Sequence, residues 1–258
     1  MPTALITGGS SGIGLEYSRT LARMGYALAL VGNREDELNS VAHSIADAFH
    51  VRVDTLCVDL SEEGAAGRVA SWARSLAEPV DVLICNAGMF FMEYLCPENL
   101  GRVRAMMALH MESVAELCIL LGSDMTSRGR GGILIMSSIT DRIPAPGIAV
   151  YSATKSFLSS FGKSLSYEMR PFGVTVTTVR PAAVDTDLYN INPALRNALR
   201  RLGVIRSPGW LAQRGIKGML KGRRTVSPGV LGTIVPALVR ILPGSLIDRL
   251  GMRWIRRQ

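Results

Sequence analysis

The 258-residue chain is 48% apolar, which is enough to bury the core of one α/β domain. Its four cysteines include no C-x-x-C pair and its three histidines are dispersed, so the composition predicts neither a disulfide framework nor a metal site. The net charge of +8 is uneven: from residue 190 onward the chain has fourteen Lys or Arg and one acid, so residues 1–189 carry a net charge of −5. The basic part has no aromatic interleaving, which argues against nucleic acid as a partner.

Short apolar runs alternate with longer amphipathic stretches, which predicts parallel strands joined by helices that cover both faces of one sheet. The predicted strands are residues 4–7, 27–31, 55–58, 82–85, 133–137 and 174–179, with a short last strand near Thr225. The predicted helices are residues 13–24, 35–49, 62–77, 98–125 and 150–170. No repeat or linker divides the chain, so we expect a single domain over residues 1–258.

The N-terminus begins with the strand-like run 4–6 and lacks the charged and long apolar segments of a secretory signal. Cys57 and Cys85 fall in apolar strand-like runs, where cysteine acts as a small hydrophobe. We therefore expect no cleaved signal, reduced cysteines and a cytoplasmic protein.

A glycine run, T-G-G-S-S-G-I-G from Thr7 to Gly14, follows the first predicted strand and leads into a helix. This is the setting in which glycines bind a dinucleotide: Gly8 permits a tight turn, Gly12 lets the backbone approach the pyrophosphate, and Gly14 allows close helix packing. The helix N-terminus adds unpaired amides and a positive dipole end. The cofactor-binding residues predicted here are Gly8, Ser10, Ser11, Gly12, Ile13 and Gly14.

The second strand ends in V-G-N-R-E, where a carboxylate would bond the adenosine ribose and repel a 2′-phosphate. Neither Gly32 nor Asn33 supplies one, and Arg34 offers a fork of donors suited to phosphate, with Asn33 and Ser11 as uncharged contacts. The sequence favours NADP(H) over NAD(H). NAD(H) stays an alternative, because an Arg34 side chain in solvent would make no such contact.

The run Y-S-A-T-K places Tyr151 and Lys155 on one face of a predicted helix, four residues apart. A cation beside a phenol favours phenolate, and so moves the phenol pKa from about 10 toward the range useful for proton transfer with an alcohol or ketone. Ser138 lies thirteen residues upstream of Tyr151, after the apolar run 133–136. Together with the glycine run, these residues resemble the short-chain dehydrogenase/reductase family over roughly residues 3–186.

The resemblance implies a Rossmann-like, doubly wound parallel sheet of about seven strands in the order 3-2-1-4-5-6-7. It also implies hydride transfer between NADP(H) and a carbonyl or secondary alcohol, with no metal required. Tyr151 would exchange the proton, Ser138 would polarise the oxygen, and Lys155 would assist Tyr151 while binding the nicotinamide ribose. Dimers or tetramers built through helices 98–125 and 150–170 are implied as well.

Further cofactor contacts are implied by matching short motifs. Asp59, with its neighbour Leu60, would face the adenine, although Asp59 could instead cap the helix predicted after Ser61. Asn86 opens an N-A-G triplet at the wall of the cleft, where holding strands together is an equal alternative. In R-P-A-A-V-D-T, Ala182 replaces the family's usual glycine and restricts the backbone. The residues matched by these motifs are Asp59, Leu60, Asn86, Ala87, Gly88, Pro181 and Thr186.

His110, in M-A-L-H-M-E-S-V, stands where the family usually has an asparagine that holds a water between the lysine and solvent. An imidazole can accept and donate a hydrogen bond, so His110 is predicted to continue a proton relay. The alternative is a satisfied polar residue in a buried helix.

Residues 187–224 lie where the family inserts a variable substrate lid, and their apolar side chains favour a lipophilic steroid, fatty-acyl or aromatic ketone over a sugar. Residues 229–258 form an apolar and then basic extension. Its last part is amphipathic, which suits peripheral contact with a membrane surface or packing on the domain or a neighbouring subunit. Two rival readings are a non-catalytic NADP-sensing protein and a membrane-surface scaffold on the same fold.

Overall fold

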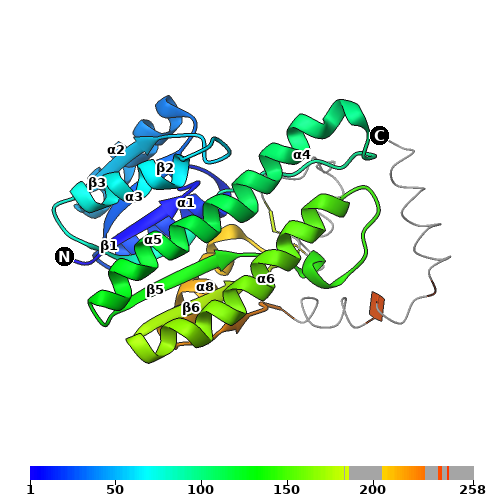
Figure 1. The fold of residues 1–258 in the computed structure, drawn as a ribbon. Coiled ribbons are helices and arrows are strands. Elements are labelled where there is room, and N and C mark those ends of the chain that lie inside the picture. The colour runs from blue at the N-terminus through cyan, green and yellow to red at the C-terminus, as the bar shows by residue number, and fades with distance from the viewer. Residues whose placement is uncertain (183, 186–204, 230–237, 240–242, 244–258) are drawn as a thin grey trace.

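The structure is a computed structural model that describes residues 1–182, 184–185, 205–229, 238–239 and 243. It contains one seven-stranded sheet in the order β3-β2-β1-β4-β5-β6-β7, and every pair of neighbouring strands is parallel (Figure 1). The predicted fold class and strand order are confirmed. The strands are β1 Thr3–Thr7, β2 Ala27–Gly32, β3 Val53–Cys57, β4 Val80–Cys85, β5 Gly131–Met136, β6 Val174–Val179 and β7 Thr225–Val226.

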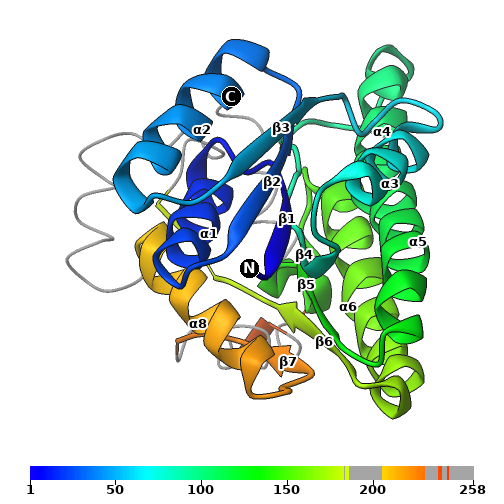
Figure 2. The ribbon, with the colours of Figure 1, turned by 90° about the vertical axis from the view of Figure 1, so that its left-hand side faces the viewer.

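Helices cover both faces of this sheet, as Figure 2 shows with α1, α2 and α8 on one side and α3, α5 and α6 on the other. Alternate residues of β1 supply the two cores: Ala4 and Ile6 pack under the first group, and Leu5 packs under the second. The helices are α1 Gly12–Arg23, α2 Glu35–Phe49, α3 Ala65–Ser75, α4 Leu100–Met107, α5 Ser113–Ser127, α6 Ala149–Met169 and α8 Pro208–Leu220. Shorter helical turns are η1 Pro97–Asn99, η2 Ala108–Glu112, η3 Ile139–Arg142 and η4 Arg170–Phe172.

Two predicted helices differ from those observed. The helix predicted from residue 62 begins only at Ala65, because Gly64 before it has a left-handed φ of 70°. The helix predicted over 98–125 is three segments, α4, the π-helical turn η2 and α5. The stretch 97–127 is long and apolar enough to resemble a membrane span, but its buried side chains contribute to the core beside β4 and β5.

Helix α8 was not predicted, and it lies inside the interval 187–224. It packs against α1 and against β5 and β6, and it buries Leu211, Ala212, Ile216 and Met219 in the core. The helix begins at Ser207, whose hydroxyl accepts a hydrogen bond from the Trp210 amide. This part of the interval is therefore a covering layer of the sheet. Most of the predicted lid and most of the extension 229–258 lie outside the described residues.

Candidate active site

The glycine run forms a tight turn between β1 and α1, and at two positions the backbone of this turn favours glycine. Gly8 and Gly12 have φ values of 64° and 51°, in the left-handed region. A Cβ on Gly14 would lie 1.9 Å from the Gly8 carbonyl oxygen. The first turn of α1 carries no acidic side chain, so the helix does not neutralise the positive end of its own dipole. The turn can thus accept a pyrophosphate.

Asn86 ties the end of β4 to this turn. Its side-chain amide donates to the carbonyl oxygens of Thr7 and Gly8, at 3.2 and 3.3 Å. The Thr7 hydroxyl oxygen accepts in return from the backbone amides of Asn86 and Ala87, each at 3.0 Å. The structural role considered for Asn86 is therefore present, and Asn86 also lines the cavity described next.

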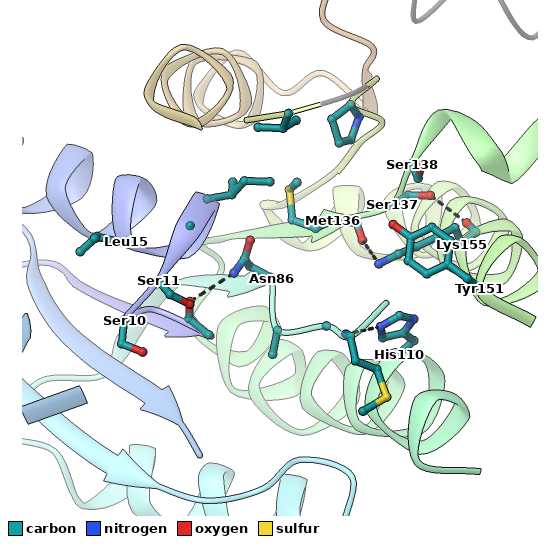
Figure 3. Close-up of a pocket in the computed structure, with 18 of the residues that line it drawn as sticks. Ser10, Ser11, Leu15, Asn86, His110, Met136, Ser137, Ser138, Tyr151 and Lys155 are labelled. Atoms are coloured by element: carbon teal, nitrogen blue, oxygen red, sulfur yellow. Dashed lines mark hydrogen bonds between the residues drawn. The ribbon is translucent and has the colours of Figure 1, made fainter. Parts of the chain in front are cut away.

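A cavity of about 750 Å³ opens at the carboxyl ends of the strands, where β1 lies between β2 and β4. Ligands of doubly wound sheets bind at this point of the topology. Figure 3 shows the cavity running from the glycine turn toward Ser138, Tyr151 and Lys155. The lining residues are Gly8, Ser10, Ser11, Gly12, Ile13, Leu15, Arg34, Glu37, Asn86, Ala87, Gly88, Met89, His110, Met136, Ser137, Ser138, Tyr151, Lys155, Pro181, Val184 and Asp185.

Helix α6 presents Tyr151 and Lys155 in its first two turns, and both side chains are buried. The Lys155 ammonium donates to the Met136 carbonyl oxygen at 3.1 Å and lies 5.4 Å from the centroid of the Tyr151 ring. Burial lowers the pKa of Lys155 to about 8, so the ammonium is still charged at neutral pH. A cation is thereby held beside the phenol, as the spacing predicted.

Ser138 caps the short turn η3, and its hydroxyl oxygen accepts from the Thr140 amide at 3.2 Å. A hydroxyl that accepts one bond still has its own proton to donate. The Tyr151 ring is fixed by edge contacts with Phe90 and His110, with centroids 5.0 and 5.8 Å away. The site can therefore offer a donor and a proton-exchanging phenol to one oxygen.

His110 lies in the π-helical turn η2 and is 1% exposed. Its Nε2 accepts from the Met89 amide at 3.0 Å, so the neutral ring carries its proton on Nδ1, 2.9 Å from the Thr154 hydroxyl oxygen. Burial, followed by the nearby Lys155 charge, lowers the pKa of His110 well below 6.5. Both ring nitrogens are therefore engaged by the protein, and the ring stays neutral at pH 6.5.

The close approach of His110 also accounts for Gly88. A Cβ there would lie 3.0 Å from His110 Nε2. The N-A-G triplet and the π-helical turn thus meet in a contact that leaves little room for a side chain.

Three predicted cofactor residues, Asn33, Asp59 and Leu60, are not among the lining residues of the cavity. Asp59 accepts from the amide and the hydroxyl of Ser61, at 2.8 and 2.7 Å, and these bonds lower its pKa. Because α3 begins at Ala65, Asp59 closes a turn and does not cap that helix. Thr186 lies outside the described residues.

Glu37 is a lining residue that the sequence analysis missed. Its carboxylate binds the Arg34 guanidinium through two contacts of 2.7 and 2.9 Å and accepts from the Ser10 hydroxyl at 3.0 Å. Arg34 and Glu37 are three residues apart at the start of α2, and this spacing is the sequence signal that indicates their contact. Arg34 therefore lines the cavity with a carboxylate partner, and its contact with a 2′-phosphate stays a prediction.

The fold and the site define a Rossmann-like domain whose cavity runs from a glycine turn suited to a pyrophosphate to a buried tyrosine and lysine. A family model described as short chain dehydrogenase matches residues 2–194. The very-long-chain 3-oxoacyl-CoA reductase of Mus musculus is 31% identical over 194 residues, which cover 73% of this chain and 61% of that protein. An uncharacterized oxidoreductase of Bacillus subtilis is 34% identical over 189 residues, covering 73% of this chain and 77% of that protein.

Among solved structures, a short-chain dehydrogenase from Sphingobium yanoikuyae in complex with NADPH has a TM-score of 0.78 and 26% identity, and the match covers 96% of each chain. The chain belongs to the short-chain dehydrogenase family, and it spans less than two thirds of the length of the mammalian reductases that it matches.

Proposed function

We propose that this enzyme transfers a hydride between NADP(H) and a carbonyl or secondary alcohol of a lipophilic substrate. The observation that carries the proposal is a single cavity with a glycine turn at one end and Ser138, Tyr151 and Lys155 at the other. The turn fits a pyrophosphate, and the second group fits a reacting oxygen.

Each residue of the second group has a distinct role. Bound NADP(H) supplies or accepts the hydride. Ser138 donates a hydrogen bond to the substrate oxygen and polarises it, and Tyr151 gives its proton to that oxygen in reduction or removes it in oxidation. Lys155 holds positive charge beside Tyr151, which favours the phenolate that remains after the proton has been given.

The choice of NADP(H) rests on Arg34. Its guanidinium lines the adenosine end of the cavity, where it can bind a 2′-phosphate in a bidentate manner. The NADPH complex of the Sphingobium relative supports this choice. Glu37 argues against a preference for NADP(H), because its carboxylate already forms an ion pair with the Arg34 guanidinium. A 2′-phosphate must therefore displace Glu37 from Arg34 or share the guanidinium with it.

The substrate class rests on the apolar walls around the reacting end. Met89, Met136 and Val184 line the cavity, and Phe90 packs on Tyr151. The mouse relative is named for a very-long-chain 3-oxoacyl-CoA substrate, which carries a ketone on a long acyl chain. A ketone-specific alcohol dehydrogenase of Comamonas testosteroni, described as specific for bulky-bulky ketones, matches with a TM-score of 0.68 at 28% identity. Both support a long or bulky apolar ketone.

The test is a screen of NADPH oxidation with long-chain 3-oxoacyl thioesters, steroid and aromatic ketones, and a sugar ketone. Tyr151→Phe removes the proton and keeps the ring, so we expect turnover to fall by about 10²–10⁴-fold with NADPH affinity largely retained. Fluorescence titration of NADPH checks the second part. Near-normal turnover by the variant, or reduction of the sugar ketone alone, would contradict the proposal.

We also propose that copies of the chain associate through the outer face of α5 and α6. These helices lie side by side in both views (Figures 1 and 2). Large apolar side chains are exposed along them, among them Ile119 at 59% and Tyr167 at 55%. Exposed apolar residues gathered on neighbouring helices are typical of a protein interface.

A further inference from the structure

A buried ion pair lies behind the catalytic serine. Arg180 Nε and Asp141 Oδ2 are 2.7 Å apart, and the side chains are only 10% and 1% exposed. Asp141 belongs to η3, the turn that follows Ser138, and Arg180 comes between β6 and Pro181. The pair therefore joins the turn that carries Ser138 to the segment that borders the cavity on the far side.

Two serines extend this contact to helix α6. The Ser159 hydroxyl donates to Asp141 Oδ2, and its oxygen accepts from Arg180 Nε at 3.1 Å. Ser159 lies 2.9 Å from the Ser137 hydroxyl, which donates to the Lys155 carbonyl oxygen at 2.8 Å (Figure 3). Ser159 is one helical turn beyond Lys155. These four side chains form one polar cluster. The cluster includes a residue of the turn that follows Ser138, and it bonds to the backbone of Lys155.

Backbone and side-chain bonds hold the same elements together. The Ile139 amide donates to the Pro181 carbonyl oxygen at 3.0 Å, and the Ser156 hydroxyl donates to the Asp141 carbonyl oxygen at 2.8 Å. The turn η3 is therefore held to α6 and to the segment that follows β6, and the ion pair is its only charged contact with that segment among the described residues.

The pair is a costly way to stabilise a fold. Removing two charges from water carries a desolvation penalty that their attraction often fails to offset, and apolar replacements are frequently neutral or stabilising. Asp141 Oδ1 has no hydrogen-bond partner among the described residues, and burial raises the pKa of Asp141, against the effects of Ser159 and Arg142. Stability alone therefore gives little reason for these two residues.

We propose that Asp141 and Arg180 are positioning residues, which set the placement of Ser138 and of the helical turn bearing Lys155 relative to the substrate oxygen. The proposal rests on the roles given above to Ser138 and Lys155. The ion pair acts on Ser138 through the turn η3 and on Lys155 through the helix α6. Its effect falls on the rate of the chemical step, because a misplacement of about 1 Å at reacting groups costs on the order of 10²-fold.

The test is the double variant Asp141→Leu/Arg180→Met, which removes both charges and leaves neither one buried alone. We expect a kcat lower by about 10–100-fold, with the melting temperature and the NADPH dissociation constant close to those of the parent. Amide hydrogen exchange of peptides covering residues 138–142 should become faster. Arg180→Lys keeps the charge and should recover part of the kcat lost in Arg180→Met.

The matched control is Arg74→Gln/Asp124→Asn, which breaks an ion pair of 2.9 Å on the surface and should change none of these quantities. A double variant with parental kcat and parental exchange would overturn the proposal. So would a kcat loss matched by loss of NADPH binding and of melting temperature, because that is general destabilisation. If the parent reduces no ketone, the proposed function fails, and the exchange of residues 138–142 alone decides whether the pair holds the turn.

Discussion

At the scale of single residues, the adenosine end of the cavity is the most unusual part of the site. Arg34 is the cation that would bind a 2′-phosphate, and Glu37 neutralises it through a bidentate contact. The guanidinium is largely exposed, so this ion pair is weak and a phosphate dianion can compete for it. If the proposed function holds, the two side chains together would set how strongly the protein discriminates between NADPH and NADH.

For the cofactor, we expect NADPH to bind more tightly than NADH. Arg34→Glu should narrow or reverse that preference, because two carboxylates then repel the phosphate. Glu37→Gln should do the opposite and tighten NADPH by several-fold, since it frees the guanidinium, and should leave NADH nearly unchanged. Fluorescence titration of both cofactors measures these effects. Equal affinities in all three proteins would show that Arg34 makes no phosphate contact.

At the scale of elements, the segment α4, η2 and α5 departs most from a regular helix. The π-helical turn coincides with His110, whose ring bonds Met89 on one side and Thr154 on the other. Single π turns often mark functional sites, because the inserted residue alters which groups the helix presents. Here the inserted turn places an imidazole against the N-A-G segment and the Tyr151 ring.

His110→Leu should lose most of the activity, because the Met89 amide and the Thr154 hydroxyl lose their partner, whereas His110→Asn should retain much of it. The pKa of His110 is lowered on folding, so the unfolded chain takes up its proton first as the pH falls below 6.5. The parent should therefore lose stability relative to His110→Asn between about pH 6.5 and 5, by up to about 1.4 kcal/mol per pH unit.

Urea unfolding of both proteins at several pH values measures that difference, and the effects of His43 and His50 cancel in it. An identical pH dependence of stability would mean that His110 is not buried as described. Activity of His110→Leu equal to that of the parent would show that the turn is held by other contacts.

The sequence predicted the elements whose signals are local. The bounds of α2 and β6 agree with the prediction residue for residue, because caps and periodicity lie within each segment. The glycine turn and the spacing of Tyr151 and Lys155 also placed their residues correctly at one cavity. The π turn could not be predicted in this way, since it depends on contacts with Met89 and Thr154, which are distant in sequence.

The ion pair behind Ser138 was missed for the same reason. Asp141 and Arg180 are 39 residues apart, and no periodic pattern links them. The family resemblance assigns the residues of helix α8 to a variable lid. The helix nevertheless has a local signal, because Leu211, Ile216 and Met219 form an apolar stripe. The adenine contact of Asp59 stays a prediction, and the structure adds that Asp59 accepts from the amide and hydroxyl of Ser61.

At the scale of the whole molecule, the proposed association through α5 and α6 predicts that one substitution lowers the mass of the assembly in solution. Ile119→Glu places a charge in the centre of the outer face of α5, and burying it would carry a large desolvation cost. We expect the parent to be a dimer or tetramer and the variant to dissociate at least about tenfold more readily. Sedimentation equilibrium measures both.

Met24→Glu is the matched control, because Met24 is an exposed apolar residue at the end of α1, on the opposite side of the sheet. It should leave the mass unchanged. An Ile119→Glu variant with the mass of the parent, or a monomeric parent, would rule out this interface.

The central position of β1 has a consequence for synthesis in the cell. During synthesis β1 must wait for β2 on one edge and β4 on the other, and the cavity is complete only after Pro181, Val184 and Asp185, which follow β6. A cofactor stabilises only a chain that can bind it, so none can assist the earlier intermediates. A nascent chain arrested before β5 would leave one edge of the apolar strand β4 unpaired, and we expect such fragments to aggregate more readily than the complete chain.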